Sequence, residues 1–482
     1  MDKAIPKNRL SLVGNKGFTK SLSAKCYYLV IREGPVFVYM NTNMTISLAV
    51  SNSENNRNRT VKRLALMAVF AFLLRLMITP YINELMNPEH ILCWEQGNVA
   101  AALVQGHGFG SPFDQHFQPS AVMPPVFPLI VAAIFKIFGV RTVASVYAVH
   151  TFDCLVSALA IFPIFLVARN SFGRKVGWWT AWAWVFSPYG IYFAAEWPWS
   201  THLLLLALFW LLYFAQKMES SNSLWLWAGF GLLGGVTALT EPSVLTVVPF
   251  LMLVAAWRLW HSGKRWLMPG LVASVALWAA ISPWLIRNAM LFHKFIPMRD
   301  SMGLELWMGN NGANLRWTSD DLHPLHDAQE QAAYDRGELA YMAEKNQEAK
   351  AYIAGHPGWY AEMCVRRAVY IWTGFWSLNK DYLAEEPTDL PNIPFATTLT
   401  LLGLTGLVLC WRQNPVDAIR FGGVMFLFPM MYYFSHPEPY HLRPLDPLIA
   451  MLGCHAVICW RAWAKEHESD DEKLMAAAVV EP

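Results

Sequence analysis

The chain has 482 residues, of which 55% are hydrophobic and 15% are charged, and its formal net charge is +2. Because soluble domains carry roughly a quarter charged residues, this composition excludes a disordered chain, a collagen-like chain and a small disulfide-rich protein. Uncharged runs such as Leu203–Phe214, Val272–Ile286 and Ala396–Cys410 recur too often for soluble cores to bury. They indicate an all-α polytopic membrane protein. The small net charge gives no indication of nucleic-acid binding.

The first 62 residues precede the first strongly apolar segment. They are basic and contain no hydrophobic stretch of the secretory type. We expect a disordered cytoplasmic tail over residues 1–62. Met40 and Met44 are alternative starting points for translation, so we assign no function to the residues before them.

About ten apolar segments have the character of transmembrane helices. In chain order they cover residues 64–82, 145–168, 176–194, 201–214, 224–238, 244–260, 267–286, 395–410, 422–434 and 447–459. Several are short for a hydrocarbon core of roughly 30 Å, so we expect tilted helices or a locally thinned bilayer.

Lysine and arginine follow alternate spans, which fixes the expected orientation. The residues concerned are Arg169, Arg174, Lys175, Lys217, Arg258, Lys264, Arg265, Arg412 and Arg420. The intervening short loops, 195–200 and 241–243, contain neither. Since cytoplasmic loops carry the excess of basic residues, we expect both chain termini in the cytoplasm.

Two longer regions then face the outer side. The first outer loop covers residues 83–142, and its apolar stretch 124–138 is short and contains Lys136, which indicates a helix on the membrane surface. Residues 291–394 form a small outer α-rich domain, with a second surface helix where Arg366 and Arg367 interrupt an apolar segment. Residues 63–290 form the transmembrane core, 395–462 the C-terminal transmembrane helices and 463–482 a cytoplasmic tail.

The first outer loop carries a composite motif. It reads Trp94-Glu95-Gln96-Gly97-Asn98, then Gly106-His107-Gly108-Phe109, then Pro124-Pro125-Val126-Phe127-Pro128. This motif resembles the first loop of GT-C glycosyltransferases, in particular the protein O-mannosyltransferase and lipid A aminoarabinose transferase group. The segments 283–288 and 303–310 are similar to a bacterial branch of that superfamily. Many relatives carry an Asp-Glu pair at the start of the loop helix, whereas this chain has Glu95 alone, about one turn later.

The resemblance implies transfer of a hexosyl or pentosyl group from a polyprenyl-phosphate-linked sugar donor. The acceptor would be a lipid, a glycan or a protein on the outer face of the membrane. The bacterial branch implies an inner-membrane protein whose active site faces the periplasm. No cofactor is required by this chemistry, and assistance by a divalent metal stays open.

Glu95 is the candidate catalytic base. Inverting transfer needs a group that takes the acceptor's proton, and a carboxylate near the membrane surface can do so. Asn98 shares its helix face and is a candidate substrate-binding residue. Glu89 and Asp114 in the same loop are alternative bases, and a solvated carboxylate is the alternative interpretation of Glu95.

Asp153 is a second catalytic candidate because it lies well inside a predicted span, where a carboxylate is costly. His150 lies one turn away, so Asp153 could pair with it, bind a metal or orient the acceptor. A polar helix-packing contact is the alternative. Glu196 and Glu241 lie at outer loop ends and are candidate substrate-binding residues, with simple exposure to water as the alternative.

The leaving phosphate needs positive charge, for which Arg287 and the His441–Arg443 segment are the candidates. Arg366, Arg367 and Lys136 are further options, and contact with lipid phosphates is the alternative for each. We interpret Asp320, Asp321, His323 and His326 as solvated loop residues rather than a metal site.

These observations predict a membrane-embedded inverting glycosyltransferase. The alternative is a transporter or flippase of lipid-linked saccharides. Transporters commonly contain repeated halves, and the sequence has no evident internal repeat. Asp153 beside His150 is the feature that favours transport.

Overall fold

A computed structural model describes the chain over residues 10–14, 18–23, 26–31, 34–39, 44–82, 94–113, 118–195, 198–312, 322–378, 380, 383, 389–436 and 439–478. The chain divides into two compact units, Met1–Leu66 and Met67–Pro482. We describe each unit by itself.

The first unit contains a four-stranded antiparallel sheet in the order β1-β2-β3-β4. The strands are β1 (Leu10–Gly14), β2 (Phe18–Ser23), β3 (Cys26–Ile31) and β4 (Gly34–Tyr39). The sequence analysis predicts a disordered tail here, and the structure differs. Segments rich in tyrosine, phenylalanine and valine, such as 26–31 and 34–39, have the composition that favours strands.

The second unit is helical, which confirms the all-α polytopic class predicted from the sequence. Helix α1 (Met44–Ile82) begins in the first unit and ends in the second. The following elements are α2 (Glu95–Val104), α3 (Val126–Phe138), α4 (Val143–Leu159), α5 (Ile161–Val185), α6 (Pro188–Ala195), α7 (Thr201–Met218), α8 (Leu224–Ala238), η1 (Pro242–Thr246), α9 (Val247–His261), α10 (Leu267–Phe292), α11 (Met302–Gly309), α12 (Ala328–Tyr334), α13 (Glu338–Gly355), α14 (Pro357–Thr373), α16 (Asp389–Gln413), α17 (Pro415–Leu427), α18 (Met430–Phe434), η3 (Pro439–Leu445) and α19 (Asp446–Ala478).

Within the described residues, six segments are long and apolar enough to cross a membrane. They are Val143–Val185, Thr201–Met218, Pro242–His261, Leu267–Phe292, Leu390–Gln413 and His441–His467. Two shorter apolar helices, α3 and α8, accompany them. The chain is therefore an integral, multi-pass membrane protein.

The first of these segments contains 43 residues, which would make a straight helix of roughly 65 Å. That length is about twice the hydrocarbon core of a bilayer. Gly173 interrupts the helix with φ 84° and ψ 175°, a backbone conformation that glycine adopts readily. The interruption falls between Arg169 and Lys175, in the loop that the charge pattern places between two spans.

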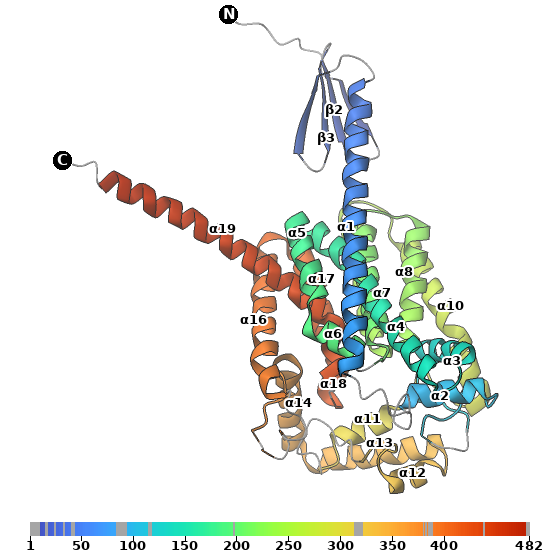
Figure 1. Cartoon of the computed structure of the whole chain (residues 1–482). Helices are drawn as coiled ribbons and strands as arrows, with labels where there is room; N and C mark the ends of the chain where they lie inside the picture. The colour runs from blue at the N-terminus through green and yellow to red at the C-terminus, as the bar shows by residue number, and fades with distance from the viewer. Residues whose placement is uncertain are drawn as a thin grey trace, which may run out of the picture. The chain divides into compact units, whose positions relative to one another are not determined.

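The first outer loop and the outer domain pack on each other at one end of the helices, where Figure 1 shows α2 and α3 beside α11–α13. Val99, Phe113, Val122 and Met123 from the loop share one buried cluster with Leu304, Trp307, Tyr334, Tyr341 and Met342 from the domain. Glu338 joins the two parts, because its carboxylate accepts the Ala121 N–H at 2.8 Å and the Tyr334 hydroxyl at 2.7 Å.

Helix α3 forms over the stretch that the sequence predicts as a surface helix. Its Phe127, Val131 and Phe135 are buried against α2 and α4, whereas Leu129 and Ile137 are exposed. In α14, the second predicted surface helix, Arg366 is exposed and pairs with Glu362. Arg367 is buried instead, and it donates hydrogen bonds to the Gly309 carbonyl and the Asn310 side chain.

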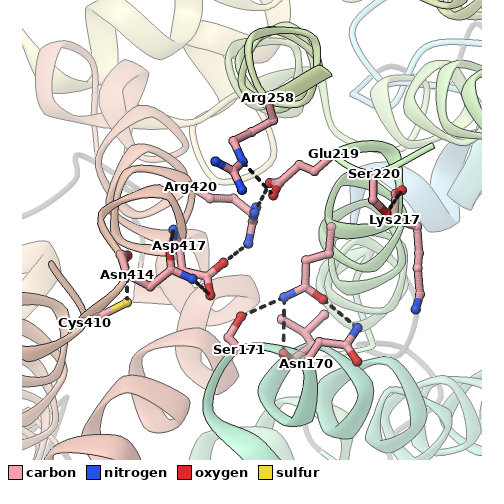
Figure 2. A network of polar contacts seen from close by, with 12 residues as sticks. Asn170, Ser171, Lys217, Glu219, Ser220, Arg258, Cys410, Asn414, Asp417 and Arg420 are labelled. Atoms are coloured by element: carbon pink, nitrogen blue, oxygen red, sulfur yellow. Dashed lines mark hydrogen bonds and ion pairs between the residues drawn. The ribbon is translucent and has the colours of Figure 1, made fainter. Parts of the chain in front are cut away.

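A polar network lies at the C-terminal ends of α7 and α9. Figure 2 shows Arg258 and Arg420 pointing toward Glu219, with Asp417 beside Arg420. Gln216 donates to the Ser171 hydroxyl at 2.9 Å and accepts from Asn170 at 3.0 Å. We call Glu219, Arg258, Asp417 and Arg420 the four-charge network. Glu241 and Arg258 are separated by about 17 residues, or roughly 26 Å of helix. The network thus lies nearly the thickness of a bilayer's hydrocarbon core away from Glu241.

Candidate active site

Glu95 is the first residue of α2, and Trp94 is the residue that caps the helix. A negative charge is favourable in the first turn of a helix, because the helix dipole presents its positive end there. The Glu95 side chain is 16% exposed, and its Oε1 lies 3.3 Å from Nε2 of His323. The sequence-predicted base is thus largely covered and faces a residue of the outer domain.

His323 is held on several sides. Its Nδ1 accepts the backbone N–H of Leu325 at 3.2 Å, and its ring meets the Phe113 ring edge-on at 5.0 Å. Burial, reinforced by the charge of the neighbouring His326, lowers the pKa of His323 to about 4. The expectation of a solvated loop histidine is therefore wrong, because Phe113 from the first outer loop covers the imidazole.

Glu305 of α11 lies close to this pair. It forms an ion pair with Arg299, accepts the Ser301 hydroxyl at 3.3 Å and lies 3.2 Å from Nδ1 of His436. Burial alone would raise the pKa of Glu305, but Arg299, His436 and His323 outweigh it and hold the pKa below its ordinary value. Glu305 is thus a stable carboxylate anion.

Glu241 caps the short helix η1, and its side chain accepts the Ser243 N–H at 3.4 Å. Burial raises the pKa of Glu241, although the charge of Arg299 opposes the shift. His441, the next candidate, stacks on Tyr432 with the rings 3.9 Å apart, and it lies 6.2 Å from His436. Glu95, Glu241 and His441 thus belong to one polar cluster that also contains Arg299, Glu305, His323 and His436.

The second unit also contains an apolar cavity of about 310 Å³. Helices α8, α9 and α10 form most of its wall, and Leu245 and Met298 complete it. Leu245 belongs to η1, which Glu241 caps, and Met298 directly precedes Arg299. Two lining residues thus lie close in the chain to Glu241 and Arg299, which belong to the polar cluster.

Asp153 lies elsewhere, within the transmembrane helices. It is fully buried on α4, and its Oδ2 is 2.8 Å from Nδ1 of His202 on α7. Pairing with His150 was one of the alternatives for Asp153; in the structure His202 reaches Asp153 from the neighbouring helix, and His150 hydrogen-bonds the backbone of Ala194. Nearby, Arg75 of α1 donates to the Trp184 carbonyl at 2.9 Å. Asp153 therefore contributes to a contact between helices, and its catalytic role stays a prediction.

Asn98 and Arg287 both hold the first outer loop. Asn98 donates to the Pro112 carbonyl at 2.6 Å and accepts from Arg141. Arg287 donates to the carbonyls of Ser120 at 2.7 Å and Phe109 at 3.2 Å, and its guanidinium lies 4.7 Å from the centre of the Trp284 ring. Both residues thus anchor the first outer loop.

Arg443 lies against a different part of the molecule. Its guanidinium is 3.8 Å from the centre of the Tyr189 ring and 3.6 Å from Asp446 Oδ2. Glu196 and the alternative bases Glu89 and Asp114 lie outside the described residues. Lys136 is exposed on α3.

Sequence reasoning did not assign Arg299, Glu305, His323 or His436 to the site. One signal was present, since Glu305 belongs to the segment 303–310 that resembles the bacterial branch. Within the part of the chain that the structure describes, no group of three or more His, Cys, Asp and Glu side chains is arranged to hold a metal. Glu305 is paired with Arg299, and assistance by a divalent metal stays an open alternative.

Comparison with known proteins gives a family for part of the chain. Residues 122–286 match the family described as dolichyl-phosphate-mannose-protein mannosyltransferase. A search of curated protein sequences finds no significant match.

Solved structures of low sequence identity are also found. The oligosaccharyltransferase of Archaeoglobus fulgidus, solved with zinc and sulfate, is 11% identical, with a TM-score of 0.49 over 86% of this chain and 51% of the other. ArnT from Cupriavidus metallidurans, bound to undecaprenyl phosphate, is 14% identical, with a TM-score of 0.36 over 82% of this chain and 78% of the other. This chain spans about half the length of the archaeal enzyme. Over residues 122–286, therefore, the chain has the sequence pattern of the mannosyltransferase family, and the resemblance predicted from its motifs is confirmed there.

Proposed function

We propose that the protein is an inverting glycosyltransferase that takes a sugar from a polyprenyl-phosphate donor and transfers it on the outer face of the membrane. The observation that carries this proposal is the position of Glu95. It is a largely covered carboxylate in a polar cluster, and two residues close in the chain to that cluster, Leu245 and Met298, line an apolar cavity. The match of residues 122–286 to a family of sugar transferases supports the same chemistry.

The donor would occupy the cavity and the cluster together. Its first isoprenoid units fit a cavity with apolar walls, and its phosphate would meet Arg299, which follows the wall residue Met298. His441 and Glu241 lie at the same end and would contact the phosphate or the sugar. The proposed substrate-binding set also contains Arg287, Arg443, Asn98 and Glu196. Arg287 and Asn98 contribute by holding the loop that carries the base.

In the proposed reaction, the acceptor hydroxyl attacks C1 of the sugar from the face opposite the phosphate. The new bond joins the acceptor oxygen to C1, and the bond between C1 and the phosphate oxygen breaks. Glu95 takes the hydroxyl proton, and the polyprenyl phosphate leaves with the bonding electrons. Attack from the opposite face inverts the configuration at C1.

We further propose a bacterial inner-membrane location, with the site in the periplasm and both termini in the cytoplasm. Arg258 and Arg420 belong to the four-charge network, and Lys217 lies beside it, at the opposite end of α9 from Glu241. An excess of basic residues is typical of the cytoplasmic side.

Glu95→Gln tests the function directly. The assay uses purified protein in liposomes, with a polyprenyl-phosphate sugar and a radiolabelled acceptor. The variant's rate of sugar transfer should fall by about 100- to 10,000-fold. Binding of the donor and the unfolding transition should stay near those of the parent protein, because glutamine keeps the size of the side chain. Glu362→Gln, an exposed carboxylate of the outer domain, is the matched control. Full activity of Glu95→Gln would refute the base assignment.

A transporter or flippase is the second candidate, because Asp153 and His202 form a buried ionisable pair within the spans. Such pairs mark ion or substrate pathways in many transporters. Movement of a lipid-linked saccharide across liposomes without sugar transfer, lost in Asp153→Asn, would favour this function. Mass spectrometry of co-purified lipid distinguishes the donor class in either case.

A further inference from the structure

We infer that His323 is a positioning residue for Glu95: a neutral imidazole, fixed in one tautomer, that donates its Nε2–H to the carboxylate of the base. This inference rests on the proposed function, in which Glu95 accepts the proton of the acceptor hydroxyl. It adds a residue that lies more than two hundred positions away in the chain and that neither the motif nor the family match includes.

The tautomer follows from the two neighbours of the ring. The Leu325 backbone N–H can only donate, and it points at Nδ1 from 3.2 Å, so Nδ1 carries the lone pair. A neutral imidazole then has its single proton on Nε2, and Nε2 is the atom that lies 3.3 Å from Glu95 Oε1. The hydrogen bond therefore runs from the imidazole to the carboxylate.

The ring orientation is fixed as well. Phe113 packs its ring against the imidazole at an interplanar angle of 86°. The carbonyl of Pro112, the preceding residue, accepts a hydrogen bond from Asn98, which lies one turn after Glu95 on α2. The helix that carries the base therefore also holds the aromatic ring that orients the partner of the base.

Burial, with help from two neighbouring histidines, keeps His323 neutral despite the carboxylates that face it. The imidazole faces Glu95 from α2, Glu305 from α11, His436 from the segment after α18, and His326 from its own loop. Burial and the two histidines disfavour a second proton, and they outweigh the attraction of Glu305. A neutral donor orients one carboxylate oxygen without neutralising the carboxylate, so Glu95 keeps its ability to accept a proton.

The experiment compares His323→Ala, His323→Gln and His356→Ala. The last is the matched control, because His356 is an exposed histidine of the same outer domain and is not among the groups that face His323. His323→Ala should lower kcat by about 10- to 100-fold, the scale expected for a displaced catalytic group, with the KM for the donor within twofold. The acidic limb of the pH profile of kcat/KM should move to higher pH, because the ionised carboxylate loses a donor. Glutamine can present an N–H at similar reach, so His323→Gln should recover most of the activity.

A second measurement does not depend on activity. The ¹⁵N spectrum of histidine-labelled protein, assigned with His323→Gln, should show one neutral ring protonated at Nε2 from pH 8 down to pH 5. A ring that is charged at pH 6, or protonated at Nδ1, would overturn the inference. A parental rate and pH profile in His323→Ala would overturn it too, provided that Glu95→Gln is inactive. Activity in Glu95→Gln would instead refute the proposed function, and the two failures are thus distinguishable.

Discussion

The protein holds two groups of buried charge, near opposite ends of α9, and they are built differently. In the four-charge network, Arg420 is 1% exposed and pairs with both Asp417 and Glu219, and Arg258 adds a second cation beside Glu219. Two acids thus face two bases. In the candidate active site, three glutamates face Arg299 and a set of histidines, of which His323 is held neutral.

The difference separates a structural role from a chemical one. A network whose charges balance within itself fixes helices and leaves little capacity to act on another molecule. The site instead has more carboxylates than permanent cations, and it differentiates them: the pKa of Glu305 is lowered and the pKa of Glu241 is raised. Environments that separate the pKa values of neighbouring acids are typical of catalytic sites.

Arg420→Met should have the largest effect on stability of the changes that test this comparison. It leaves Asp417 and Glu219 buried without their main partner, which costs about 3–5 kcal/mol of unfolding free energy. Equilibrium unfolding in mixed micelles measures the loss. Arg412→Met, which removes an exposed cation at the end of α16, should stay close to the parent. Equal stability of the two variants would show that the network is not structural.

The second largest effect should come from acidification, which lowers the unfolding free energy through His323 in the candidate active site. His323 has a pKa of about 4 in the folded protein and about 6.5 in the unfolded chain, so the unfolded chain binds the extra proton between these values. The stability provided by the neutral imidazole is therefore complete above pH 6.5 and is lost as the pH falls toward 4. The loss is at most about 3 kcal/mol. Unfolding measured at pH 7 and pH 5 should show a smaller difference for His323→Gln, and an unchanged difference would contradict this assignment.

Arg299→Gln should act on the donor rather than on the fold. We expect a rise in the KM for the polyprenyl-phosphate sugar of about 10-fold, because one charge-assisted contact with the phosphate is lost. Lys294→Gln, an exposed cation nearby in the chain, is the control. A parental KM in Arg299→Gln would indicate that the phosphate binds elsewhere, with Arg287 or Arg443 as the next candidates.

Arg258→Gln should have the smallest effect. Its side chain is 45% exposed and lies 3.8 Å from Glu219, so solvent screens the pair. We expect a loss below about 1 kcal/mol in the same unfolding assay. A loss as large as that of Arg420→Met would mean that the two arginines act as one unit.

The helices could be predicted well from the sequence because their signals are local. Hydropathy and basic residues identify the spans, and they place a turn between Arg169 and Lys175, where Gly173 breaks the helix. The motif likewise identified Glu95 and the helix α3. The strands of residues 10–39 were missed, because the basic character of the segment outweighed its short aromatic and aliphatic runs.

The partners in the site could not be predicted, because they come from distant parts of the chain. His323 and Glu305 lie in the outer domain, and nothing in their local sequence indicates that the domain folds onto the first loop. The same reason applies to Asp153, for which helix periodicity offers His150 whereas packing supplies His202 from α7. Arg287 was expected at a phosphate, but its local pattern does not reveal the two loop carbonyls that it binds.

The contact between α8 and α10 bears on the size of the donor lipid in the proposed function. A Cβ atom at Gly231 would overlap the backbone carbonyl of Ala273, so the two helices approach as closely as they do only because residue 231 is glycine. Gly231 and Ala273 also line the apolar cavity. The width of that cavity is thus set by the spacing of the two backbones. We expect Gly231→Ala to push α8 and α10 apart and to change the preferred length of the isoprenoid chain.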